Sequence, residues 1–481
     1  MIVLLVGAIL MIRGGIFGMF AAVLAWSLLG GSSALDLPAL GGSSIQPAYL
    51  ALGFLILRII LADAPTRLLI AKSFPSNAAL VVFCVYGVIG AMILPRIFEG
   101  VMEVASLKVK TPYLFYADPL RYTSQNLTSA IYLVGTLLAA LAAWIVARGT
   151  NVPARVPMLL ITLTFAHVGQ GLIALALTTA GRMDVLEIIR NANYAQLDQS
   201  YRGLLRIAGF FPEASAYAAY GLPLLVVTTE MWLRNIQSRL SGIAALTLAA
   251  MLVFSTSSSA YVGLAGYGLL LVLRILIFPG AIPPRKVLNL LSLGFVGTIA
   301  VLGAALAFPR FAATFVDMLS AMTVAKGESS SGLQRQFWAR QGIEAFKASF
   351  GLGIGTGSFR SSSLITAIAG SMGVIGLIAF TAYVWDVLKP LRASTYYGGR
   401  DVPFSHALGA AVGWAAVVGL IPATVSLPTP DPGLMFALFA GLAIGLRSNV
   451  EPVLLQMPMA DPQSSRSNLN LEDSQPVERT L

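Results

Sequence analysis

Charged side chains are scarce in this sequence, because 11% of its 481 residues are charged and 57% are hydrophobic. No water-soluble fold buries that much apolar surface, so the scarcity of charge excludes an ordinary soluble protein. The alternating segments of about 10 residues that a lipid-spanning β-barrel requires are also missing. Runs of about 20 apolar residues recur instead, and each is long enough to cross a membrane as a helix.

Cysteine and histidine are nearly absent. The single cysteine, Cys84, lies within an apolar run and leaves no partner for an intrachain disulfide. The two histidines, His167 and His406, fall within or at the start of apolar runs, and no Cys, His and acidic residues have the spacing of metal ligands. We therefore predict no metal site and no cofactor, and we expect His167 to make a hydrogen bond in helix packing.

The apolar runs predict an all-α, polytopic integral membrane protein with about 12 transmembrane helices, preceded by a short helix over residues 1–12. The predicted spans are 14–30, 48–62, 78–94, 126–147, 157–180, 208–229, 240–256, 258–278, 288–308, 363–388, 405–425 and 432–446. Lysine and arginine recur in the short connections on one side, which is therefore predicted to be cytoplasmic.

The opposite, outer side receives the longer connections 95–125, 181–207 and 309–362. We expect the last of these to be a large outer loop, late in the chain. Residues 1–450 are predicted to form one transmembrane domain. Residues 451–481 are polar and proline-bearing, which predicts a disordered cytoplasmic tail.

The net charge of +10 raises the question of nucleic acid binding. The basic residues are spread singly among the spans and do not line one face, so the sequence predicts no nucleic acid partner. Anionic membrane lipid, or a phosphorylated lipid substrate, fits this distribution better.

Arginines are unusually frequent in the outer loops, where basic residues are normally depleted. Five arginines have an acid three or four residues away and are predicted to form local ion pairs; they are Arg96, Arg121, Arg190, Arg202 and Arg340, with Glu99, Asp118, Glu187, Asp198 and Glu344. Arg206, Arg335 and Arg360 have no such acid and are better candidates for binding an anion. Trp338, one turn after Arg335, either contacts its guanidinium by a cation–π interaction or is an interfacial aromatic.

The segment Gly351-Leu-Gly-Ile-Gly-Thr-Gly-Ser-Phe359 has the glycine content of a phosphate-binding loop. It lacks the following lysine and the preceding strand of a nucleotide site. We interpret it as a close-packed segment that returns to the membrane, in which backbone N–H groups are still able to face an anion.

Two stretches carry a family resemblance. The first is Arg206-Ile-Ala-Gly-Phe-Phe-Pro-Glu-Ala-Ser-Ala-Tyr-Ala218, at the start of a predicted span. The second begins at Ser331-Gly-Leu-Gln-Arg335-Gln-Phe-Trp338 and continues through the glycine-rich segment to Gly373-Val-Ile-Gly-Leu377. Together they resemble the O-antigen polymerase and ligase superfamily of bacterial C-type glycosyltransferases. Arg340 and Gly351 also fit the Arg-x10-Gly pattern of some polymerases.

The resemblance implies a glycosyltransferase of the bacterial inner membrane, with its large outer loop and its active site facing the periplasm. Its donor and acceptor would be undecaprenyl-diphosphate-linked glycans, with a chain-length regulator protein as a further partner. Ligases of the superfamily usually carry a histidine just after the glycine-rich segment, where this chain has Arg360-Ser-Ser-Ser-Leu364. This departure favours a polymerase for O-antigen, exopolysaccharide or capsule over an O-antigen ligase.

The resemblance also suggests roles for single residues. Arg206 and Arg335 are predicted to bind the diphosphate, with Arg340 or Arg360 as a third contact, because arginine stabilises charge that grows on a leaving diphosphate without a metal ion. Glu213, or else Glu344, is predicted to accept the proton of the acceptor hydroxyl, with Glu213 preferred. A transporter or flippase for lipid-linked oligosaccharide is the alternative from another class, but the inverted repeats expected of one are not visible.

Overall fold

The computed structural model describes residues 2–37, 43–105, 107, 115–192, 200–201, 204–307, 313, 316–317, 320, 329–397 and 402–448. The predicted tail 451–481 and the predicted ion pair between Arg202 and Asp198 lie outside these residues. The described chain is mostly helical, which confirms the all-α prediction.

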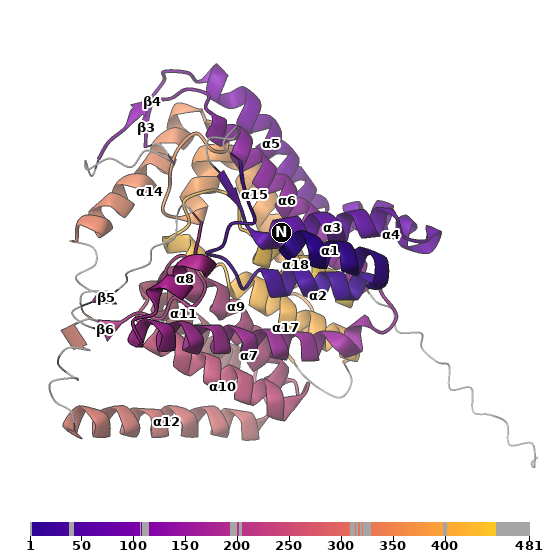
Figure 1. Cartoon of the computed structure of the whole chain (residues 1–481), viewed down its shortest axis with the longest axis vertical. Coiled ribbons are helices and arrows are strands. Elements are labelled where there is room, and N and C mark those ends of the chain that lie inside the picture. Colours follow the sequence, from indigo (N-terminus) through magenta and orange to yellow (C-terminus); the bar gives the residue numbers. More distant parts are fainter. Residues whose placement is uncertain are drawn as a thin grey trace, which may run out of the picture. The chain divides into compact units, whose positions relative to one another are not determined.

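The helices follow one another along the whole chain (Figure 1). They are α1 (Ile2–Arg13), α2 (Ile16–Trp26), α3 (Pro47–Ile60), α4 (Ala64–Ser76), α5 (Ala78–Ile97), α6 (Ser124–Ala147), α7 (Val152–Thr179), α8 (Met183–Ile189), α9 (Ala214–Leu233), α10 (Ser238–Phe254), α11 (Ser258–Ile277), α12 (Pro284–Ala307), α14 (Ser330–Ala348), α15 (Leu364–Leu388), α16 (Ala393–Tyr396), α17 (Phe404–Val418), the 3-10 helix η2 (Pro422–Val425) and α18 (Leu434–Arg447).

In the described part of the chain, three short antiparallel pairs of strands lie in connections between these helices. They pair β1 (Leu35–Leu37) with β2 (Ser43–Ile45), β3 (Glu103–Val104) with β4 (Asp118–Pro119), and β5 (Ser200–Tyr201) with β6 (Leu204–Leu205). In the first hairpin Leu35 lies opposite Ile45, and in the second Glu103 lies opposite Pro119. These hairpins occupy parts of the longer connections and leave the helices to form the core.

Within the described chain, seven helices are long and apolar enough to cross a membrane, or up to eight if the bent pair α3–α4 counts as one span. The seven are α5, α6, α7, α11, α12, α15 and α17 extended through η2. The pair α3–α4 bends by 117°, where the sequence predicted one span over 48–62. The chain is thus an all-α protein with the composition of a multi-pass membrane protein.

Helix α18 lies at the centre of the packing and contacts α6, α17 and α15 (Figure 1). Small residues permit this closeness: a Cβ added at Gly441 would lie 2.0 Å from the carbonyl oxygen of Ala140 on α6. Backbones that approach so closely gain packing contacts where lipid offers no hydrophobic driving force. The pairing of α6 with α18 therefore fixes the loop that precedes α18.

The predicted large loop 309–362 contains a helix of its own. Helix α14 begins after Ser329, whose hydroxyl accepts a hydrogen bond from the N–H of Gly332 at 3.1 Å and so caps the first turn. It packs against α15, where a Cβ on Gly342 would lie 2.3 Å from the carbonyl oxygen of Thr366. Arg335 and Trp338 are therefore presented from a helix.

Candidate functional site

A cavity of about 540 Å³ lies where the residues before α9, the residues before α15 and the loop between η2 and α18 meet. Its walls include the aromatic residues Tyr49, Phe211, Tyr220 and Trp338, and the hydroxyl residues Ser27, Ser215, Ser361, Ser362 and Ser426. Its charged residues are Glu213, Arg335 and Arg360. Three residues that the sequence singled out, from three separate segments, therefore share one cavity.

Arg360 lies between the glycine-rich segment and α15. Its backbone N–H donates to the carbonyl oxygen of Ala105 at 2.8 Å, which fixes where the side chain starts. The guanidinium carbon lies 4.3 Å from the ring centroid of Trp338, while Nε is buried and has no hydrogen-bond partner among the described residues. Burial lowers the pKa of Arg360, the Glu213 carboxylate raises it and Arg335 lowers it. A cation in this state is suited to bind an anion.

Arg335 reaches the cavity from α14. Its carbonyl oxygen accepts a hydrogen bond from the hydroxyl of Ser362 at 2.6 Å, which ties α14 to the residues before α15. The cation that lies over the Trp338 ring is Arg360, and the described residues show no such contact for Arg335. The spacing of Arg335 and Trp338 along one helix gave no sign that the cation over Trp338 comes from another segment.

Glu213 stands at the N-terminus of α9 with an extended backbone (φ −157°, ψ 163°). Its carbonyl oxygen accepts the N–H groups of Ala216 and Tyr217, and its carboxylate accepts the hydroxyl of Ser215. The positive end of the helix dipole stabilises a carboxylate here. Glu213 is thus held at the cavity wall in a position to accept a proton.

Arg206 does not line the cavity but lies close to the same carboxylate. Burial lowers the pKa of Arg206, whereas Glu213 and Tyr261 raise it. Its Nε is buried and has no hydrogen-bond partner in the described part of the chain. Glu213 is therefore within electrostatic range of both Arg206 and Arg360, so the carboxylate is the common neighbour of the two cations.

Arg340 and Glu344 lie apart from this group. Both are exposed on α14 and neither lines the cavity. The described residues show no ion pair between them, so the predicted pairing is wrong. Arg340 and Glu344 therefore form no part of the cavity wall.

The predicted ion pair between Arg190 and Glu187 is also wrong. Its side chain is buried, with 6% of the residue exposed, and its Nε donates to the carbonyl oxygen of Gly209 at 2.9 Å, not to Glu187. Arg190 caps the end of α8 with a non-helical backbone (φ −96°, ψ 58°), so the i, i−3 spacing no longer places Glu187 on its face. Burial lowers its pKa. Arg190 holds the turn at Gly209, which leads into Glu213.

The glycine-rich segment is close-packed, as predicted. Gly351, Gly353, Gly355 and Gly357 all have positive φ, between 81° and 94°. A Cβ on Gly353 would lie 2.5 Å from the backbone of Ser371, and one on Gly357 would lie 2.4 Å from the carbonyl oxygen of Gln125. The N–H groups of Gly353, Ile354 and Gly355 donate to Ser349, Gly370 and Ser371. These amides are therefore engaged within the protein and do not face an anion.

The loop between η2 and α18 forms one wall of the cavity through Pro428, Pro432 and Gly433. Asp431 holds this loop, because its Oδ1 accepts the hydroxyl of Thr136 at 2.6 Å and the N–H of Gly433 at 3.1 Å. The residue keeps some exposed surface, but its carboxylate is enclosed, and burial raises its pKa to about 6. Sequence reasoning missed Asp431, and the run Pro428-Thr-Pro-Asp-Pro-Gly433 was the signal for a rigid turn.

An apolar groove of about 470 Å³ adjoins the cavity. It lies between α2 and α7 and is lined by Ala25, Trp26, Leu28, Leu29, Ala166, Gly169, Gln170, Ile173 and Phe210. Leu28 and Leu29 line the groove while Ser27 and Gly30 line the cavity, and Phe210 and Phe211 divide in the same way. The polar cavity and the apolar groove are therefore lined by neighbouring residues of the same two segments, 27–30 and 210–211.

His167 is fully buried on α7, as its place in a span predicted. Its ring stacks on Tyr217 at 4.1 Å between centroids, and Nδ1 is hydrogen-bonded to Gln170 at 3.0 Å. Among the described residues, no three His, Cys, Asp or Glu side chains are grouped so that they could hold a metal ion.

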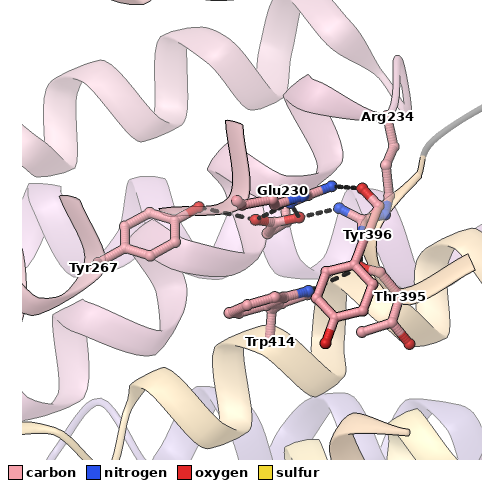
Figure 2. Close-up of polar contacts among 7 residues, drawn as sticks. Glu230, Arg234, Tyr267, Thr395, Tyr396 and Trp414 are labelled. Carbon is pink, nitrogen blue, oxygen red and sulfur yellow. Dashed lines mark hydrogen bonds and ion pairs between the residues drawn. The ribbon is translucent and has the colours of Figure 1, made fainter. Parts of the chain in front are cut away.

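A second set of charges lies at the opposite end of α9 (Figure 2). Glu230 is fully buried and accepts hydrogen bonds from Arg234, from Arg274 at 2.9 Å and from the hydroxyl of Tyr267 at 3.2 Å. Arg234 also donates to the carbonyl oxygen of Thr395 at 2.7 Å. Opposite charges that satisfy one another in this way join α9, α11 and α16, so this cluster stabilises the fold.

Comparison of the chain with protein-family models, with curated proteins and with solved structures gives no match.

Proposed function

We propose that the protein is a glycosyltransferase that polymerises undecaprenyl-diphosphate-linked oligosaccharide repeat units at the periplasmic face of the bacterial inner membrane. The observation that carries this proposal is the cavity in which Glu213, Arg335 and Arg360 meet beside Arg206. Such a site combines cations for a diphosphate, a carboxylate for a proton and aromatic walls for a sugar.

The neighbouring apolar groove supports an amphiphilic substrate. A carrier lipid places a charged diphosphate and an apolar chain next to each other, and the cavity and groove offer matching surfaces along residues 27–30 and 210–211. We propose that the isoprenoid chain lies between α2 and α7 while the diphosphate faces the arginines. A soluble sugar nucleotide would have no use for this groove.

The proposed reaction needs no metal ion. The acceptor hydroxyl oxygen attacks the anomeric carbon of the donor, the bond from that carbon to the diphosphate oxygen breaks, and the hydroxyl proton passes to Glu213. Negative charge grows on the departing diphosphate, where fixed arginines stabilise it. Arg335 and Arg360 contact the diphosphate in the cavity and Arg206 acts beside Glu213, whereas Arg340 lies outside the cavity.

The topology that this reaction requires is part of the proposal. We propose about 12 spans, formed by the long helices together with the shorter apolar helices, with the cavity and the connections 95–125, 181–207 and 309–362 on the periplasmic side. A chain-length regulator protein is a proposed partner. Ligation of O-antigen is the second candidate within the superfamily, and the absence of histidine from Arg360-Ser-Ser-Ser-Leu364 speaks against it.

The test is to incubate the purified full chain in lipid nanodiscs with lipid-linked repeat units and to separate the products by size. We expect a ladder of longer lipid-linked glycans that forms equally well with a metal chelator present. Transfer to a lipid A-core acceptor without a ladder would indicate the ligase instead. Unchanged substrate that moves across vesicle bilayers would indicate a transporter.

A further inference from the structure

A second apolar groove, of about 660 Å³, runs between α9, α10, α11 and α12. Most of its lining is aliphatic, as with Leu225, Ile243, Leu246, Leu271, Leu290 and Leu293. Helices α10, α11 and α12 also carry many large apolar side chains that are exposed, as expected of a surface in contact with acyl chains. The groove is therefore suited to an extended hydrocarbon chain.

One end of the groove is polar and basic. Ser238, Arg239 and Asn289 line it there, and Lys286 lies directly beside it. The ammonium group of Lys286 donates to the hydroxyl of Ser238 at 2.7 Å and lies 4.3 Å from the ring centroid of Trp232. Helices α10 and α12 begin at this end and α9 and α11 end there, so the helix dipoles offset one another and the positive potential comes from the basic side chains. No Asp or Glu lines the groove, and Glu230, which contacts the lining residue Tyr267, is neutralised by Arg234 and Arg274.

From this arrangement we propose that the groove binds an anionic glycerophospholipid. One acyl chain lies along the aliphatic walls, and the phosphate and its anionic headgroup lie at Arg239 and Lys286. The side-chain charges at the mouth are positive, so they distinguish a lipid with net negative charge, such as phosphatidylglycerol or cardiolipin, from zwitterionic phosphatidylcholine. Trp232 and the stem of Lys286 are the interfacial residues expected where a headgroup meets the chains.

This site is separate from the proposed carrier site. Helix α9 begins beside the cavity at Ala214 and ends at Leu233, next to the basic end of the groove. A helix of 20 residues is about 30 Å long, the thickness of the hydrocarbon core. The headgroup in the groove therefore belongs to the opposite leaflet from a diphosphate in the cavity.

The experiment measures lipid retained by the purified full chain in native mass spectrometry, after equilibration with equal amounts of phosphatidylglycerol and phosphatidylcholine. We expect phosphatidylglycerol to be retained preferentially. The double variant Arg239→Gln/Lys286→Gln should reduce that preference about 25-fold, since a basic residue at a membrane surface contributes about fivefold. The matched control is Arg67→Gln/Lys72→Gln on α4, which should leave the preference unchanged.

A second pair of variants tests the acyl chain. Ala249→Phe fills the groove and should reduce retention of both lipids, whereas Ala250→Phe, exposed on the same helix and outside the groove, should not. Equal preference in the wild type and the Arg239/Lys286 double variant would overturn the proposal. Displacement of phosphatidylglycerol by undecaprenyl phosphate would also overturn it, because the groove would then be a carrier site. Neither readout depends on polymerase activity.

Discussion

The guanidinium of Arg360 lies over the indole of Trp338, with its carbon 4.3 Å from the ring centroid. The two residues come from different segments, one from the end of the glycine-rich segment and the other from α14. An aromatic face holds a guanidinium in plane without using its N–H donors. Arg360 is thereby oriented towards the cavity while its donors stay available for an anion.

Removal of this cation should therefore impair catalysis much more than folding. Arg360→Ala is expected to lower the rate of glycan polymerisation roughly 100- to 1000-fold, the effect of losing one fixed stabiliser of developing charge, and Arg335→Ala and Arg206→Ala should behave similarly. Arg360→Lys should restore little of this rate, because an ammonium lacks the planar set of N–H donors with which a guanidinium binds two phosphate oxygens. The matched control is Lys347→Ala, an exposed cation on α14, with wild-type rates in the same ladder assay. Wild-type polymer from all three arginine variants would exclude the proposed site.

A side chain that fills the groove between α2 and α7 should lower the affinity for a long-chain donor more than the affinity for a short-chain donor. A Cβ on Gly169 would meet no atom within 4 Å, so Gly169→Leu extends into the groove without disturbing the helices. We expect affinity for a long-chain polyprenyl donor to fall about tenfold, the effect of excluding roughly two methylene groups, while a short-chain donor binds as before. Gly53→Leu, equally unhindered but outside the groove, is the control. Equal losses for both donors would place the chain elsewhere.

Removing one partner from the buried cluster around Glu230 should destabilise the protein. Glu230→Gln leaves Arg234 and Arg274 without a counter-charge and is expected to lower the free energy of unfolding by about 3–5 kcal/mol. Tyr267→Phe removes one hydrogen bond and should cost about 1 kcal/mol. Thermal unfolding in detergent measures both. A Glu230→Gln variant as stable as Tyr267→Phe would show that the two arginines find other partners.

The glycine-rich segment should tolerate no side chain at its tightest positions. Gly353→Ala combines a positive φ of 86° with a Cβ only 2.5 Å from the backbone of Ser371. Gly100 separates the two effects, because its φ is 72° but its surroundings are open, so Gly100→Ala should cost only about 1 kcal/mol of backbone strain. We expect the midpoint of thermal unfolding to fall clearly further for Gly353→Ala. Similar midpoints would mean that the segment shifts to make room.

Asp431 should make stability depend on pH. Its pKa is raised to about 6 in the folded protein, from 3.8 ordinarily, so the folded state holds the proton more tightly than the unfolded state. This contribution to stability is complete below about pH 4 and is lost as the pH rises through 6. Asp431→Asn keeps an oxygen acceptor for Thr136 and should remove this loss, which thermal unfolding at pH 4.5 and pH 7.5 would reveal. The control is Asp184→Asn, at an exposed residue. It should leave the change in stability between pH 4.5 and pH 7.5 as in the wild type, because Arg182 lowers the pKa of Asp184.

The sequence predicted the helices well because long apolar runs leave few alternatives in a membrane. It also singled out Glu213, Arg335 and Arg360, which the structure brings to one cavity, and Arg206, which lies near Glu213. It failed for Arg190, because spacing predicts a pair only where the helix continues, and α8 ends at that residue.

Contacts between distant segments could not be predicted from the sequence. Nothing in the residues near Trp338 indicates that Arg360 covers it, and nothing near Asp431 indicates Thr136, which is 295 residues away. The bend between α3 and α4 was missed for a related reason, since hydropathy measures apolar length but not direction. These features depend on tertiary packing, which overrides local preference.

The charges that join α9 and α11 also constrain how the chain is made. Glu230 and Arg234 leave the ribosome together and neutralise one another on one helix, but Arg274 follows Glu230 by 44 residues. Arg274 lies in the last turn of α11, where the arginine of a lone helix reaches the interface, so pairing with Glu230 moves its guanidinium from the interface into the protein. The complete ion-pair cluster around Glu230 therefore forms only after α11 has been synthesised and has packed against α9.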